Sequence, residues 1–135
     1  ARPREETRLR HDVLSMREKM RQHSHQSKPG IFHLKQDAGG IVDIEFMVQY
    51  LVLRWAAQYP DLLVFTDNVR ILETLSHVGL LSVSDADLLQ ETYLAYRTAT
   101  HRCALQNQPS EVSGDSFVEQ RAAVINIWQH LMLVE

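Results

Sequence analysis

The segment of this chain whose residue types best suit chemistry is KQDAGGIVDIEF, which runs from Lys35 to Phe46. It contains the chain's only pair of adjacent glycines, Gly39 and Gly40, just before a long apolar run. Glycine permits close backbone approach and positive φ, and the amide groups at the start of a helix attract phosphate. The spacing therefore fits either an anion site, in which exposed amides and Lys35 hold a phosphate, or a tight turn that packs two helices together.

Two carboxylates follow the glycines in the same segment. Asp43 falls in the first turn of the expected helix, where the helix dipole favours a negative charge. Glu45 is flanked by apolar residues and would lose solvation in a core helix, so we expect it to be paired or hydrogen bonded. Residues two apart on a helix are rotated by about 200°. Asp43 and Glu45 should therefore point to opposite sides, which disfavours a metal site made from these two alone.

A second group of polar side chains shares one face of a later helix. Tyr93, Arg97 and His101 follow one another at spacings of four residues. Arg97 is a candidate partner for Glu45 or Asp43, because a charge-assisted hydrogen bond would join the two helices. We expect Arg97 and His101 to have a structural role beside the candidate site, with direct ligand contact as the alternative.

The other side chains do not predict a self-contained catalytic site. His23 and His25 lack cysteine or carboxylate partners at metal-ligand spacing, so we predict no metal site there. The sequence also lacks a phosphate-binding GxxxxGK loop, a GxSxG nucleophile elbow and an HExxH motif. We therefore expect no catalytic residue in this chain and no cofactor bound to it alone.

Helical periodicity dominates the elements that must position these groups. Helices are expected over about 4–23, 41–57, 67–78, 84–106 and 116–132. Strand-like alternation is weak, which leaves room for one short strand pair at most. Five helices joined by short loops predict an all-α helical bundle.

Local signals also predict how individual helices begin and pack. Ser84 and Asp87 imitate a capping box, and residues 109–114 are expected to form a turn. The first helix carries an apolar stripe that we expect to face the core, made of Leu9, Val13, Met16 and Met20.

The chain length of 135 residues suits one domain. We divide it into a basic linker helix (1–23), a loop with the glycine turn (24–40) and the bundle core (41–135). Residues 1–35 contain nine basic and four acidic side chains, hence about +5, and the remainder about −8. The basic segment suits either a polyanion such as a nucleotide triphosphate or a solvated helix surface. A nucleic acid partner is not predicted, because the body is acidic and no basic recognition helix is evident.

A reducing, cytoplasmic location is expected, because the single cysteine, Cys103, leaves no internal disulfide. No membrane span is predicted, since charged residues interrupt the apolar runs. The chain opens without methionine and is helix-like from its start, so we expect it to be part of a longer polypeptide.

Three blocks of the sequence resemble a known family in order and approximate spacing: GGIVDIEFMVQYLVLRWA, TDNVRILETL and YLAYRTATHRCALQ. They are similar to the C-terminal helical region of the bifunctional glutamine synthetase adenylyltransferase/adenylyl-removing enzymes, and the resemblance runs from about Met16 to the end. The acidic Asp43 after the glycines resembles the adenylylating half of that family, and the closing WQHLMLVE resembles a natural C-terminus.

This resemblance implies an accessory domain of a larger enzyme that transfers AMP from ATP, with Mg²⁺, to a tyrosine of glutamine synthetase. It also implies a response to glutamine and to the PII signal protein. The family's catalytic carboxylates lie in an upstream nucleotidyltransferase domain of the same chain, so this part alone should be inactive. By resemblance, the wall of the nucleotide cleft would include Lys35, Gly39, Gly40, Asp43 and Glu45.

Two other functions remain open at this point. The first is a regulatory interaction module that binds PII or relays glutamine, in which the glycine turn is only structural. The second is the helical domain of a PII uridylyltransferase, which carries a similar turn but matches less well after it.

Overall fold

The computed structural model describes residues 3–24 and 28–133. Five α-helices, two short turns of other helix types and two three-residue strands follow one another along the chain. They are α1 (Pro3–Ser24), β1 (Ile31–His33), α2 (Ile41–Trp55), η1 (Pro60–Leu63), α3 (Asn68–His77), α4 (Val83–Leu105), β2 (Glu111–Ser113), α5 (Val118–Trp128) and η2 (Gln129–Leu133). The predicted all-α bundle of five helices is therefore confirmed.

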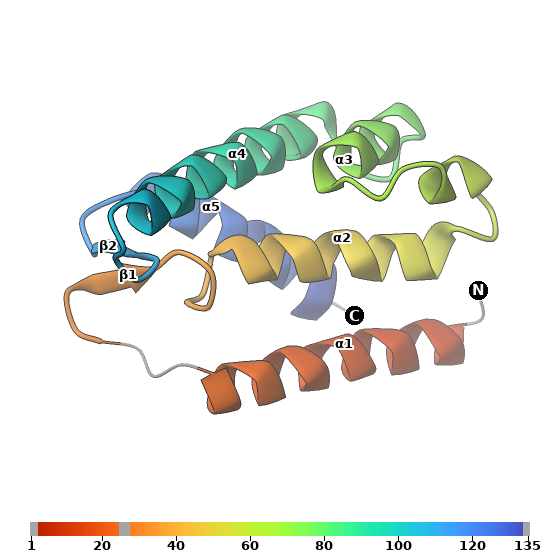
Figure 1. Cartoon of the computed structure of the whole chain (residues 1–135). Helices are drawn as coiled ribbons and strands as arrows, with labels where there is room; N and C mark the ends of the chain where they lie inside the picture. The colour runs from red at the N-terminus through yellow and green to blue at the C-terminus, as the bar shows by residue number, and fades with distance from the viewer. Residues whose placement is uncertain (1–2, 25–27, 134–135) are drawn as a thin grey trace.

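The helix α2 lies at the centre of the bundle. It contacts α1, α3, α4 and α5, and Figure 1 shows it between α1 on one side and α3 with α4 on the other. Eight of its fifteen residues are buried, as the apolar run on nearly every face of this helix predicts. The core of the domain thus forms around the helix that the glycine pair precedes.

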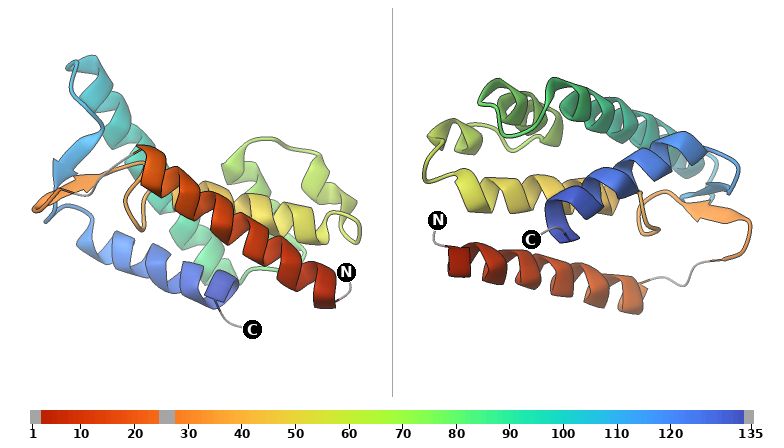
Figure 2. Two further views of the ribbon diagram at one scale, coloured as in Figure 1. Left: turned by 90° about the horizontal axis from the view of Figure 1, so that it is seen from below. Right: turned by 180° about the vertical axis from the view of Figure 1, so that it is seen from behind.

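A two-stranded antiparallel sheet closes one end of the bundle. Phe32 in β1 lies opposite Val112 in β2, and the flanking pairs are Ile31 with Ser113 and His33 with Glu111. The region expected to be a plain turn over 109–114 is therefore partly a strand. Figure 2 shows this sheet beside the ends of α4 and α5, so β1 is held next to helices that come much later in the chain.

Two helix starts differ from their predictions. The cap of α4 is Ser82, whose hydroxyl accepts the Asp85 amide at 3.0 Å, so the capping signal at Ser84 was placed two residues too late. The helix α5 begins after Phe117, which adopts a left-handed conformation with φ of 59°. By contrast, α3 begins close to the start of the helix expected over 67–78, and Asp67 caps it by accepting the Val69 amide at 2.8 Å.

The inner face of α1 also differs from the predicted stripe. Val13 is buried, but Met16 is 62% exposed and Met20 is 36% exposed. The buried position that follows Val13 by one helical turn is the charged Arg17, only 2% exposed. The helix therefore packs along a face rotated from the methionines, because a charge on α2 requires a partner there. Residues 25–27 of the expected loop, including His25, lie outside the described residues.

Candidate functional site

The candidate site is the connection between β1 and α2, which we call the diglycine turn (residues 34–43). The carbonyl of Leu34 accepts the Ile41 amide at 2.9 Å, and the carbonyl of Lys35 accepts the Val42 amide at 3.1 Å. The Gly40 amide donates to the Asp37 carbonyl at 2.9 Å, and the Gly39 amide donates to the Asp43 carboxylate at 2.8 Å. Of the two alternatives, the one with exposed amides does not match the structure, because the turn itself uses all four.

Both glycines of the turn are needed for steric reasons. Gly39 has φ of +81°, and a Cβ atom there would lie 2.8 Å from the carbonyl oxygen of Arg121. A Cβ on Gly40 would lie 2.6 Å from the Leu34 carbonyl oxygen and 3.0 Å from that of Asp37. The alternative of a tight turn that packs two segments together thus accounts for the glycine pair in geometric terms.

Asp43 forms a buried ion pair with α1. Its Oδ1 lies 2.6 Å from Nε of Arg17, and the two side chains are 3% and 2% exposed. Nη2 of Arg17 donates to the Gln36 carbonyl at 2.6 Å, so one guanidinium binds both the part of the turn before the glycines and the start of α2. Two charges removed from water in this way need close pairing and additional hydrogen bonds. The turn supplies one through the Gln36 carbonyl, while Nη1 of Arg17 is buried without a hydrogen-bond partner among the described residues.

Sequence reasoning missed Arg17, because both interpretations of the basic first helix, a polyanion-facing surface and a solvated surface, place its charges outside the core. A signal was nevertheless present. Arg17 follows Val13 by four residues and shares its helix face, and a buried Asp43 requires a cation. Arg97, the predicted partner of Glu45 or Asp43, forms no ion pair with either carboxylate among the described residues.

Arg121 on α5 is a second residue that sequence reasoning missed. Its Nε and Nη2 both donate to the Ala38 carbonyl at 3.3 Å. Its guanidinium also lies over the ring of Phe32, 4.0 Å from the ring centroid. The diglycine turn is therefore held from α1 by Arg17 and from α5 by Arg121.

An aromatic cluster lies under the turn. The ring of Tyr96 makes edge contacts with Phe32 and Phe117, with centroids 5.5 Å and 5.2 Å apart. Burial raises the pKa of the Tyr96 hydroxyl, with Arg121 lowering it and Asp43 raising it. The hydroxyl therefore stays protonated beside the Asp43 carboxylate across the physiological pH range.

The open side of the site carries Lys35, Glu45 and Arg97. Lys35 and Arg97 are exposed and Glu45 is half-buried. Burial raises the pKa of Glu45, while the charges of Lys35 and then Arg97 lower it. Among the described residues no ion pair within 4.0 Å joins Glu45 to either cation. The three charged side chains therefore share a surface but do not form an ion pair with one another.

The structure also locates the remaining predicted residues. Arg97 lies over the Tyr93 ring, 5.7 Å from its centroid, and His101 is exposed one turn further along α4. Asp43 and Glu45 differ as the 200° rotation predicts, since one is buried against α1 and the other faces Lys35 and Arg97. The described part of the chain contains no cluster of three or more potential metal ligands. Over the same residues, no helix combines the length and apolar composition needed to cross a bilayer.

A known protein family matches most of this chain. The sequence model of the GlnD PII-uridylyltransferase family matches residues 8–113. The chain belongs to the GlnD PII-uridylyltransferase family. The matched residues extend from α1 to β2, so the family match includes the diglycine turn and Arg17 on α1 but ends before Arg121 on α5.

Curated relatives of this family member carry a more specific name. A protein of Acinetobacter baylyi is 50% identical over 133 residues, which is 96% of this chain and 14% of that protein. One from Pseudomonas aeruginosa is 50% identical over 145 residues, covering 98% of this chain and 15% of its own length. One from Pseudomonas syringae pv. tomato is 59% identical over 102 residues, which is 76% of this chain and 10% of that protein. All three are named bifunctional glutamine synthetase adenylyltransferase/adenylyl-removing enzyme, and the chain spans about 14% of the first one's length.

Proposed function

We propose that this chain is a helical accessory domain of a glutamine synthetase adenylyltransferase, which transfers AMP from ATP to a tyrosine of glutamine synthetase. The observation that carries the proposal is 50% identity to a curated adenylyltransferase over 96% of this chain. The relatives' names favour this function over that of a PII uridylyltransferase, although the two share the family model. A cytoplasmic location belongs to the same proposal.

In this proposal the predicted site residues divide into two roles. Gly39, Gly40 and Asp43 build and fix the diglycine turn, because their polar groups are bonded within the chain. Lys35 and Glu45 present charge on the open side, where they form part of the wall of the nucleotide cleft. Arg17 acts as a positioning residue, since its bond to the Gln36 carbonyl holds the backbone next to Lys35.

The open side suits one part of an ATP–Mg²⁺ complex. Lys35 and Arg97 are exposed cations that can neutralise phosphate oxygens. The described residues offer no group of three metal ligands, so we assign the magnesium ligands to the nucleotidyltransferase domain of the longer enzyme. Bound magnesium would neutralise charge on the transferred phosphoryl group.

The proposal is tested by Lys35→Ala and Glu45→Gln in the intact adenylyltransferase. We expect Lys35→Ala to lower kcat/KM for ATP about tenfold, the effect of losing one charge-assisted contact. Lys28→Ala is the matched control, because Lys28 is also exposed but pairs with Glu111 on the strand β2 at 3.0 Å. Unchanged kcat/KM in both site variants would remove Lys35 and Glu45 from the cleft. Asp43→Asn is less informative, because it disrupts a buried ion pair as well.

A titration distinguishes this accessory role from a regulatory one. The chain is titrated separately with ATP, glutamine, PII and glutamine synthetase while binding heat is recorded. Binding of PII or of glutamine alone would favour a regulatory module over a wall of the nucleotide cleft. Binding of glutamine synthetase, or an ATP response that Lys35→Ala removes, supports the accessory role.

A further inference from the structure

The corner formed by η1 and α3, which we call the η1–α3 corner (residues 60–77), exposes three consecutive large apolar side chains. Leu63 is 65% exposed, Val64 is 66% exposed and Phe65 is 42% exposed. Their neighbour Leu62 is 1% exposed and anchors the turn in the core. Because a 3₁₀ turn repeats every three residues, burying Leu62 directs Leu63 and Val64 outward; Phe65 follows after η1 has ended at Leu63. Isolated exposed apolar residues are common, but a contiguous group of them marks an interaction surface.

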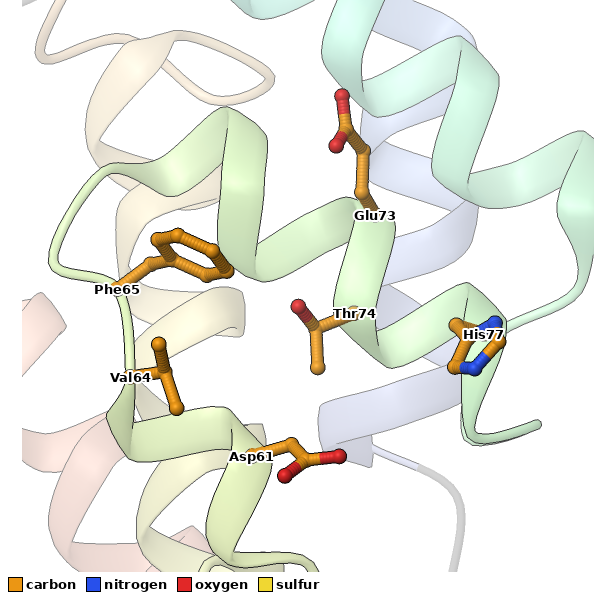
Figure 3. Close-up of a pocket in the computed structure, with 6 residues that line it drawn as sticks. All are labelled: Asp61, Val64, Phe65, Glu73, Thr74 and His77. Atoms are coloured by element: carbon orange, nitrogen blue, oxygen red, sulfur yellow. The ribbon is translucent and has the colours of Figure 1, made fainter.

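A pocket lies beside these residues, between η1 and α3. Its volume is about 480 Å³, and its lining includes Val64 and Phe65 together with Asp61, Glu73, Thr74 and His77. Figure 3 shows Asp61 at one end and Glu73 at the other, with Val64 and Thr74 between them. The pocket thus combines an apolar middle with a carboxylate at each end.

We propose that the η1–α3 corner binds a protein segment that presents one aliphatic or aromatic side chain with a lysine or arginine on each side. The apolar anchor would fill the space beside Val64 and Thr74, and the two flanking cations would approach Asp61 and Glu73. Charge complementarity determines this choice of partner, because both carboxylates at the ends of the pocket are exposed. Arg70 lies 5.7 Å from the centroid of the Phe65 ring, and its charge disfavours a partner cation on that side.

This surface is separate from the diglycine turn. None of its lining residues contributes to the contacts of Gly39, Gly40 or Asp43. The proposal therefore does not depend on the nucleotide role of Lys35 and Glu45.

The test uses the 135-residue chain labelled with ¹⁵N and three short synthetic peptides. The first contains Lys-Ala-Leu-Ala-Lys, the second replaces both lysines by glutamate, and the third replaces the leucine by serine. We expect the first peptide to shift the amide signals of residues 61–77 saturably. The dissociation constants of the other two peptides should be at least about tenfold larger. Equal binding of the lysine and glutamate peptides, or no saturable shift in this range, overturns the proposal.

Two variants and one control sharpen the test. The double variant Asp61→Lys with Glu73→Lys should reverse the preference, so that the glutamate peptide binds more tightly than the lysine peptide. Val64→Ser should weaken binding of the lysine peptide, while Leu105→Ser, at a site 72% exposed at the far end of α4, should leave it unchanged. Circular dichroism confirms that each variant keeps its helical content. Concentration-dependent signals of residues 63–65 in the free chain would mean that a second copy occupies the surface, which also overturns the proposal.

Discussion

The diglycine turn and the η1–α3 corner use the same kinds of residue in opposite ways. At the turn, four successive backbone amides and the Asp43 carboxylate are bonded within the chain, and the charge that pairs with Asp43 is buried. At the corner, two carboxylates and three apolar side chains face solvent around a pocket. The segment with the more recognisable sequence motif is thus the one whose polar groups are bonded within the chain.

The difference follows from where each region lies in the bundle. The turn enters the central helix α2 and meets α1 and α5 at once, so any unpaired polar group there would be costly. The outer side of the corner faces water, which solvates its polar groups, while Leu62 of η1 and the inner face of α3 are buried in the core. Matched substitutions in the two regions therefore test the comparison directly.

The largest difference in stability between the two regions is expected when an arginine of each is replaced. Arg17→Met breaks a buried ion pair and removes the bond to the Gln36 carbonyl, which should lower the free energy of unfolding by about 3–5 kcal/mol. Arg70→Met at the corner removes only a cation–π contact with Phe65 and should cost about 1 kcal/mol or less. Urea unfolding of both variants measures the difference. Similar costs at the two sites would show that the pair contributes no more than a surface contact.

Glycine substitutions should give the next largest difference. Gly39 and Gly79 both have left-handed backbones, with φ of +81° and +84°, but only Gly39 would place a Cβ against a neighbouring backbone, 2.8 Å from the Arg121 oxygen. Gly79→Ala should cost about 1–2 kcal/mol from φ alone, whereas Gly39→Ala adds about 1–3 kcal/mol from the clash. Thermal unfolding of the two variants checks this order, and a greater loss in Gly79→Ala would contradict the described packing of α5 on the turn.

A smaller, pH-dependent change in the free energy of unfolding is expected when Glu45 is replaced. Burial raises the pKa of Glu45 above its ordinary value of 4.5, so the folded chain binds more protons than the unfolded chain just above that pH. Stability contributed by this group therefore falls as pH rises through this interval. Because glutamine does not titrate, the stability of Glu45→Gln relative to wild type should increase between about pH 4 and about pH 7.

Unfolding curves across that range provide the measurement for Glu45. The control is Glu73→Gln on the exposed face of α3, which separates an effect of burial from a general effect of removing one carboxylate. A stability difference for Glu45→Gln that does not change with pH would argue against its burial beside Lys35 and Arg97.

Much of the fold was predictable because its signals are local. The apolar run after Gly40 predicted the central helix, and the helix expected over 67–78 matches α3 to within one residue at each end. Errors occurred where two local signals compete, as at the start of α4, where Ser82 and Ser84 each precede an aspartate by three residues. The inward face of α1 was misassigned because Met16 fits an apolar stripe better than Arg17 does, although Arg17 is the buried residue.

The candidate site was less predictable than the helices. The segment itself was recognisable from the glycine pair and its carboxylates, and the opposite directions of Asp43 and Glu45 followed from helix geometry. Which cation each carboxylate meets was not predictable, because several arginines are available and the spacing along one helix does not determine which other helix lies opposite. The corner at Phe65 carried no motif and became evident only from its exposure and pocket.

By itself the sequence determined which segments are helical, where glycine and proline interrupt them and which helix is most apolar, since these properties depend on neighbouring residues. Only the tertiary structure decided that Arg17 pairs with Asp43, 26 residues away, and that Arg121 meets Ala38, 83 residues away. It also decided that the amides of the turn are hydrogen bonded within the chain, while the apolar and acidic side chains of the η1–α3 corner are exposed to solvent. The physical reason is that burial and pairing depend on which surfaces meet when the helices pack, and one helix alone does not contain that information.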